Sequence, residues 1–146
     1  MKRVLVLLVL LAGCASGLDD FASNRLPMFG TEQGRVKTAA MRDADAVFIA
    51  EALRLEPTRT AAAQRSAALG WTYLRRGDLQ TAMARFNQAW LLDPKIGASY
   101  HGFAVVRAEQ GAPDAEIVAL FKRAIAAGDA EPGASEDFAR YRARRP

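Results

Sequence analysis

The sequence predicts an all-α fold, and three observations support that prediction. Alanine is abundant while β-branched residues are few after the first ten positions, and alanine loses no side-chain entropy on entering a helix. Apolar residues recur three and four positions apart, as at Leu79, Ala82 and Phe86. Glycine, proline and aspartate separate these periodic stretches at intervals of helix length. A chain of 146 residues has room for one compact domain.

Six helices are predicted, and local signals set their ends. The first ends before Pro57, because proline has no backbone N–H to continue a helix. Gly77 and Gly111 follow the second and fourth helices, where a left-handed cap favours glycine. Ser135 is expected to cap the last helix. The predicted helices cover residues 43–55, 60–76, 79–92, 96–110, 113–127 and 135–141.

The first fourteen residues combine a basic start with a short apolar run. Lys2 and Arg3 precede the unbroken run Val4–Ala12, which is far shorter than the roughly 20 residues that a membrane-spanning helix needs. A run of this length is typical of a signal peptide, so residues 1–13 are left out of the fold prediction. Cys14 is the only cysteine, which excludes an internal disulfide.

The end of the apolar run, Leu11-Ala12-Gly13-Cys14, resembles the lipobox of bacterial lipoprotein precursors. The resemblance implies that the sulfur of Cys14 receives a diacylglyceryl group and that its freed amine is then acylated. Only a thiolate is nucleophilic enough to become the thioether, and several acyl chains, at about 0.8 kcal/mol per buried CH₂, give stable anchoring. Ala15, not aspartate, follows the cysteine, which implies transport to the outer membrane, facing the periplasm. The alternative is an ordinary signal peptide with an incidental cysteine.

Residues 14–42 are expected to form a lipid-anchored tether, because Gly, Asp, Ser, Asn and Pro are mixed with scattered apolar residues there. The cluster Leu26–Gly30 is more apolar than a tether requires. We expect it to fold back onto the first helix, and a docking motif is the alternative.

A set of residues at fixed spacing runs from the second predicted helix into the third. Gly70 and Ala82 allow two helices to approach closely, and Tyr73 and Phe86 fill the space between them. The spacing resembles the 34-residue tetratricopeptide pattern, with Ser66 in place of its early tryptophan. The matching residues are Leu69, Gly70, Tyr73, Gly77, Asp78, Ala82, Phe86, Ala89, Asp93 and Pro94.

Residues 63–96 form this strong repeat, and residues 97–130 resemble a degenerate second one. Tyr100 holds the early aromatic position of the second unit, and Phe103 begins the pair that replaces Leu-Gly. Arg107 stands where the pattern has tyrosine.

The repeat resemblance implies an architecture for residues 43–146, namely a short solenoid of antiparallel helix pairs with flanking capping helices. Ile49 and Pro57 resemble positions in the second helix of an earlier half unit. The segment Gly70–Pro94, together with Pro27–Gly30, is also similar to small tetratricopeptide lipoproteins.

Catalytic, metal-binding and nucleic-acid-binding patterns are not found. His101 is the only histidine, so neither a triad nor a metal cluster is suggested. Gly30 and Gly34 lack the strand–loop–helix context of a phosphate loop. The net charge of +4 is concentrated near the ends, and the arginines of residues 140–145 are interpreted as a solubilising helix end, with phospholipid contact as the alternative. We expect no enzyme activity, cofactor, metal, nucleic acid or small-molecule substrate.

The tetratricopeptide resemblance implies that a peptide binds along the concave face formed by the first helix of each unit. Trp71 occupies a groove position, and tryptophan and arginine are enriched among interface hot spots. The alternative is that Trp71 packs under the helix of residues 43–55. A carboxylate clamp is not expected, because Ala67, Trp71, His101 and Val105 occupy its positions. The expected groove residues are Gln64, Trp71, Leu74, Arg75, His101, Val105 and Glu109.

The sequence therefore predicts an adaptor or assembly factor of the bacterial envelope that binds a protein partner and is held to the membrane through Cys14. The alternative is a structural homo-oligomer in which exposed solenoid ends stack. Sedimentation would separate the two, because a groove binder is expected to be monomeric when free.

Overall fold

The computed structural model describes residues 26–28, 37–127 and 133–144. Every regular element within these ranges is an α-helix, which confirms the all-α prediction. Cys14 and residues 1–13 lie outside the described residues. The helices are α2 (Ala39–Leu55), α3 (Arg59–Arg75), α4 (Leu79–Leu92), α5 (Gly97–Glu109), α6 (Asp114–Ala126) and α7 (Ala134–Ala143).

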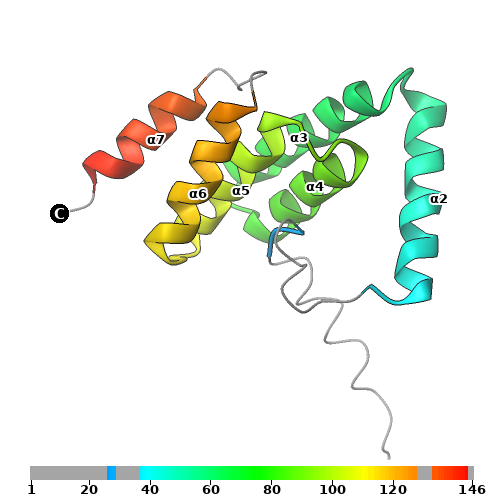
Figure 1. Ribbon diagram of the computed structural model, residues 1–146, viewed down its shortest axis with the longest axis horizontal. Helices are drawn as coiled ribbons and strands as arrows, with labels where there is room; N and C mark the ends of the chain where they lie inside the picture. The colour runs from blue at the N-terminus through cyan, green and yellow to red at the C-terminus, as the bar shows by residue number, and fades with distance from the viewer. Residues whose placement is uncertain (1–25, 29–36, 128–132, 145–146) are drawn as a thin grey trace, which may run out of the picture.

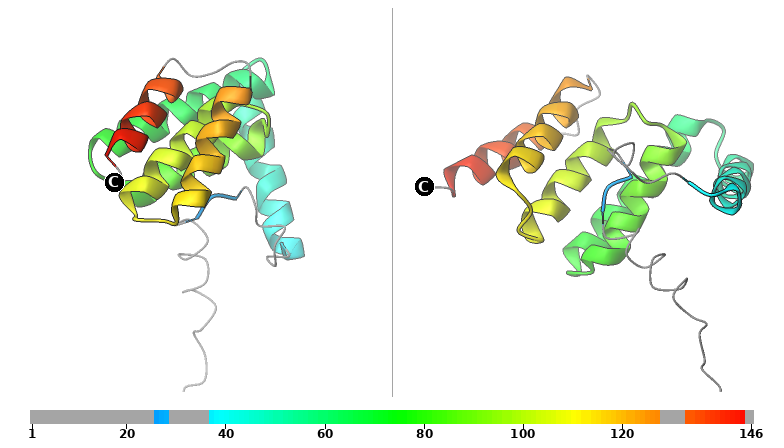
Figure 2. Two further views of the ribbon diagram at one scale, coloured as in Figure 1. Left: turned by 60° about the vertical axis from the view of Figure 1, so that its left-hand side comes forward. Right: turned by 60° about the horizontal axis from the view of Figure 1, so that its bottom comes forward.

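The helices succeed one another in chain order along the long axis of the molecule, with α2 at one end and α7 at the other (Figures 1 and 2). The most extensive packing is between α3 and α4 and between α5 and α6. Packing of α4 against α5 joins these two pairs. In the part of the chain that the structure describes, no helix combines the length and the apolar character needed to cross a membrane.

Helix α2 begins earlier than predicted and packs loosely. The hydroxyl of Thr38 accepts a hydrogen bond from the backbone N–H of Met41 at 3.2 Å, so the helix starts at Ala39 and not at Asp43. The expected boundary between tether and domain at residues 42–43 therefore falls inside α2. None of the residues of α2 is buried.

The turns after α3 and α5 follow the prediction, whereas the start of α7 does not. Gly77 and Gly111 have φ angles of 77° and 70°, in the left-handed region that glycine adopts without strain. The last helix begins at Ala134, directly after Gly133, whose φ angle is 110°. Ser135 is therefore an exposed residue within the helix and does not cap it.

The core is centred on Phe86, which is fully buried as predicted. A Cβ atom added at Gly70 of α3 would lie 2.6 Å from the Phe86 ring, and one added at Gly102 of α5 would lie 2.3 Å from it. Two glycines thus make room for one ring between three helices. Leu69, one of the residues that match the tetratricopeptide pattern, is 41% exposed and faces the loosely attached α2.

The second helix pair replaces an aromatic contact by an ion pair. Arg107 of α5 takes the position expected for tyrosine, and its Nε and Nη2 donate to the two carboxylate oxygens of Glu116 at 2.6 and 3.0 Å. This bidentate contact links α5 to α6 next to the turn at Gly111.

The segment Leu26–Met28 packs on α4, not on the first helix as expected. Asn87 Oδ1 accepts from the backbone N–H of Met28 at 2.6 Å, and Asn87 Nδ2 donates to the carbonyl of Leu26 at 3.0 Å. Asn87 is 3% exposed, so these two bonds satisfy an amide that is otherwise buried in the core. Phe29 and Gly30 of the same cluster lie outside the described residues.

Candidate functional site

A groove with a volume of about 670 Å³ lies between α3, α5 and α7. Its residues on α3 recur at helical spacing, so they share one face of that helix. Helix α7 forms the opposite wall. The lining residues are Gln64, Ala68, Trp71, Thr72, Arg75, His101, Gly133, Glu136, Asp137 and Arg140.

Trp71 forms the aromatic wall of the groove. Its ring lies edge-on to Phe86, with centroids 5.2 Å apart, and to His101, with centroids 4.6 Å apart. The side chain is half-buried, and its Nε1 is buried without a hydrogen-bond partner among the described residues. Trp71 therefore borders both the core and the groove, and it faces α5 instead of packing under α2.

His101 is almost fully buried beneath the groove. Its Nε2 lies 2.8 Å from Oδ2 of Asp137, and its side chain is 4% exposed. Its other ring nitrogen, Nδ1, is buried and has no partner in the described part of the chain. The contact joins α5 to α7, so His101 helps to fix the helix that forms the far wall.

Asp137 is held as a carboxylate by its neighbours. Burial alone would raise the pKa of this carboxyl, but hydrogen bonds and electrostatic interactions with Arg140 and His101 lower the pKa below its ordinary value. The same contact with Asp137 raises the pKa of Arg140. The wall formed by α7 therefore carries a fixed ion pair at neutral pH.

Four of the seven predicted groove residues line this groove: Gln64, Trp71, Arg75 and His101. Leu74 and Val105 are half-buried and pack against the core instead, and Glu109 is exposed at the end of α5. These three residues do not line the groove.

The contribution of α7 was not predicted. Gly133, Glu136, Asp137 and Arg140 reach the groove only because α7 folds against α5 and α6. Asp137 and Arg140 form an ion pair within α7, but no local pattern in the sequence shows which surface that pair faces.

The groove presents an aromatic wall, amide and hydroxyl groups, and charges of both signs. Arg75 Nη2 donates to the hydroxyl of Thr72 at 3.3 Å, and both Arg75 and Gln64 are exposed at the rim. Among the described residues, no group of three or more His, Cys, Asp or Glu side chains could hold a metal ion. Such a surface suits non-covalent binding of a chain with mixed polar and apolar groups. No protein-family model, curated protein or solved structure matches this chain.

Proposed function

We propose that this protein is a membrane-anchored interaction module of the bacterial envelope, which binds a segment of a partner protein in the groove between α3, α5 and α7. The observation that carries the proposal is the half-buried Trp71 in the groove wall, between exposed polar residues at the rim and the core residue Phe86. Tryptophan in such a setting offers a large apolar contact at a low cost in side-chain entropy.

A tetratricopeptide-type arrangement of the helices is part of this proposal. The close packing of α3 on α4, with Gly70 against the ring of Phe86 and Ala82 fully buried, supports it. First helices of successive units would then line the groove, with α7 as the helix that closes the array.

The membrane anchor is proposed from the sequence Leu11-Ala12-Gly13-Cys14. Acylation of Cys14 would hold the domain at the outer membrane, facing the periplasm, where assembly of other envelope proteins is a suitable task. The partner would then be a periplasmic protein or the periplasmic part of a membrane protein.

Crosslinking in intact envelopes tests where the partner binds. A photo-crosslinking amino acid at Gln64, which lines the groove, should capture the partner, whereas the same group at the exposed Glu109 should not. Equal capture at both positions, or capture only at Glu109, would contradict the proposal.

The substitution Trp71→Ala tests the energetic role of the groove wall. A hot-spot residue loses about 2 kcal/mol or more, a roughly thirtyfold weaker affinity. The control is Trp90→Ala, which removes another half-buried tryptophan outside the groove. Affinity is measured on the folded fraction of each variant, and a loss of stability in Trp71→Ala with unchanged affinity would place binding elsewhere.

A homo-oligomer is the second candidate function, and the surface of α2 favours it. Of the six exposed large hydrophobic residues among those described, four lie on this helix: Met41, Val47, Leu53 and Leu55. Sedimentation of the domain measures its oligomeric state and so decides between a groove-binding module and a homo-oligomer. Self-association that Val47→Glu abolishes would support stacking through α2. A monomer at high concentration would exclude it.

A further inference from the structure

Three exposed basic side chains surround the turn between α4 and α5. Arg59 Nε donates to the carbonyl of Leu92 at 3.0 Å, and Lys95 lies in the turn itself. The guanidinium of Arg123, from α6, lies 5.9 Å from the ring centroid of Tyr100, at the start of α5. Arg59 of α3, Lys95 of the turn and Arg123 of α6 are called the basic surface here.

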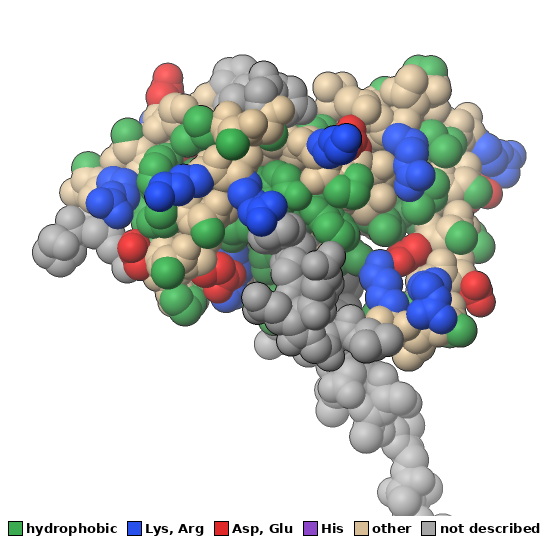
Figure 3. Space-filling model, viewed as in Figure 1, with side chains coloured by type: hydrophobic (Ala, Val, Ile, Leu, Met, Phe, Trp, Pro, Cys, Tyr) green, Lys and Arg blue, Asp and Glu red, His purple; other side chains and the backbone are tan. Residues whose placement is uncertain are grey.

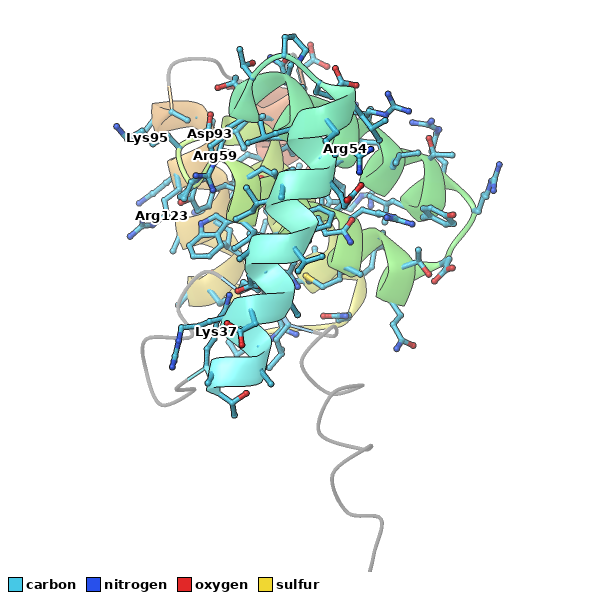
Figure 4. All side chains as sticks on the ribbon, turned by 90° about the vertical axis from the view of Figure 1, so that its right-hand side faces the viewer. Lys37, Arg54, Arg59, Asp93, Lys95 and Arg123 are labelled. Atoms are coloured by element: carbon cyan, nitrogen blue, oxygen red, sulfur yellow. The ribbon has the colours of Figure 1, made fainter. Side chains whose placement is uncertain are left out.

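Among the described residues, Asp93 is an acidic side chain beside these cations. It accepts from the hydroxyl of Thr60 at 2.9 Å and from the backbone N–H of Lys95 at 3.1 Å. Figure 4 shows Arg59, Asp93, Lys95 and Arg123 grouped on one side of the molecule. On this side, which faces the viewer in Figure 3, Lys and Arg side chains are interspersed with apolar ones.

Aromatic residues lie beneath these cations. The indole N–H of Trp90 donates to the hydroxyl of Tyr100 at 3.2 Å, and that hydroxyl donates to the carbonyl of Pro94 at 2.7 Å. Trp90 is half-buried and Tyr100 is 8% exposed. A partly exposed Trp beside Lys and Arg, as Trp90 is here, is typical of surfaces that meet lipid headgroups.

The segment Leu26–Met28 ties the start of the described chain to the same helix that carries Trp90. Its two hydrogen bonds to Asn87 fix it on α4, on the side that faces the viewer in Figure 1. Cys14 precedes Leu26 by 12 positions, which span at most about 40 Å when fully extended. An acylated Cys14 would therefore keep this side of α4 within about 40 Å of the bilayer.

We propose that the basic surface rests on the anionic phospholipid headgroups of the membrane in which Cys14 is anchored. None of its three residues lines the groove, so the groove stays open to a partner while the domain lies on the membrane. Nucleic acid is the less suitable polyanion, because Tyr100 is buried and only the half-buried Trp90 remains as a ring on which a base could stack. The inference depends on the proposed anchor only because an acylated Cys14 would keep this side of α4 near the bilayer.

Vesicle binding by a chain without the anchor tests the proposal. A chain that begins at Ala15 keeps the whole core, which extends from Ala62 to Ala134. It should bind vesicles of phosphatidylglycerol mixed with phosphatidylcholine and not vesicles of phosphatidylcholine alone. Binding should disappear at about 1 M salt, where charges are screened beyond roughly 3 Å.

Charge-removing variants locate the contact. Each cation near an anionic surface contributes roughly fivefold to binding, so Arg59→Gln, Lys95→Gln and Arg123→Gln together should weaken it about a hundredfold. Lys95→Gln alone should weaken it about fivefold without any loss of fold, because its side chain is exposed in a turn. The control removes the same charge at Arg54, Arg65 and Arg76, three exposed residues outside the groove, and should leave binding nearly unchanged.

Two results would overturn the proposal. Equal losses in both triple variants would mean that net charge alone draws the chain to the vesicles, and tighter binding to single-stranded DNA than to the mixed vesicles would assign the surface to nucleic acid. The test is independent of the anchor. If the chain binds vesicles but Cys14 is never acylated, the proposed anchor is wrong and the proposed role of the basic surface is supported. If Cys14 is acylated but the chain does not bind vesicles, the proposed anchor is supported and the proposed role of the basic surface is wrong.

Discussion

Phe86, on α4, connects the two helix pairs because both α3 and α5 contact its ring. Gly70 and Trp71 of α3 meet it from one side, and Gly102 of α5 meets it from another. Each helix can approach only because a glycine replaces a side chain at the contact, and this complementarity makes the position sensitive to changes in either direction. The aromatic wall of the groove is built on the same ring, so core packing and the candidate site depend on one residue.

Phe86→Ala should lower the free energy of unfolding by about 3–5 kcal/mol, because it leaves a cavity between three helices. Urea denaturation of the domain measures this difference. The matched control is Ile125→Ala, at a residue 37% exposed on α6, and it should cost far less. A loss below about 1 kcal/mol in Phe86→Ala would mean that the ring is not at the centre of the core.

Gly102→Ala should destabilise the protein although alanine is the better helix former. Alanine gains about 1 kcal/mol over glycine in an unconstrained helix, but here its Cβ would lie 2.3 Å from the Phe86 ring. Because that ring is fully buried and cannot move away, overpacking should dominate and cost about 1–3 kcal/mol. In a Phe86→Leu background the penalty should shrink, and an unchanged penalty there would assign it to another cause.

Helix α7 is attached by three contacts of different chemistry. Phe138 stacks on Phe121 with centroids 5.3 Å apart, and the hydroxyl of Tyr141 donates to Asp114 at 2.8 Å. Asp137 adds the polar contact to His101. Because α7 forms one wall of the groove, any condition that weakens these contacts also changes the groove.

Acid should weaken the docking of α7 through Asp137. Its pKa is lowered in the folded protein from the ordinary 3.8, so its stabilising contribution is complete above that value and is lost as the pH falls below it. Asp137→Asn should lower the melting temperature by about 2–5 °C at pH 6, and the difference from the wild type should shrink as the pH falls below the ordinary pKa of 3.8. A difference that grows as the pH falls would contradict the assigned direction.

The helices were predictable because their limits are set by neighbouring residues. Pro57, Gly77 and Gly111 act within one turn of the chain, and the structure has helix ends next to all three. The position of Leu26–Met28 was not predictable, since it depends on Asn87, about sixty residues away. The exposure of Leu69 was not predictable for a similar reason, because it depends on how closely α2, a separate helix, approaches α3.

At the scale of the whole molecule, the candidate groove was partly predictable. Its α3 side follows from helical spacing, so Gln64, Trp71 and Arg75 share a face once the helix is known. The groove wall formed by α7 depends on the path of the chain after α6. No local pattern around residues such as Asp137 indicates that path. Gly102 was a sequence signal that another element packs closely against α5, since a glycine in a helix interior costs stability unless packing requires it.

The proposed membrane anchor also concerns the whole molecule, and the prediction that tests it is made at Cys14. Cys14→Ser should block acylation and leave the precursor with its leader attached, because serine lacks the nucleophilic thiolate that forms the thioether. Metabolic labelling with a radioactive fatty acid, together with the apparent mass of the chain, measures both effects. Because the core lies within Ala62–Ala134, the variant should fold as the wild type does, and circular dichroism of the purified chains checks this. A Cys14→Ser chain that is still cleaved at the same bond and labelled by fatty acid would show that the anchor is not formed at this residue.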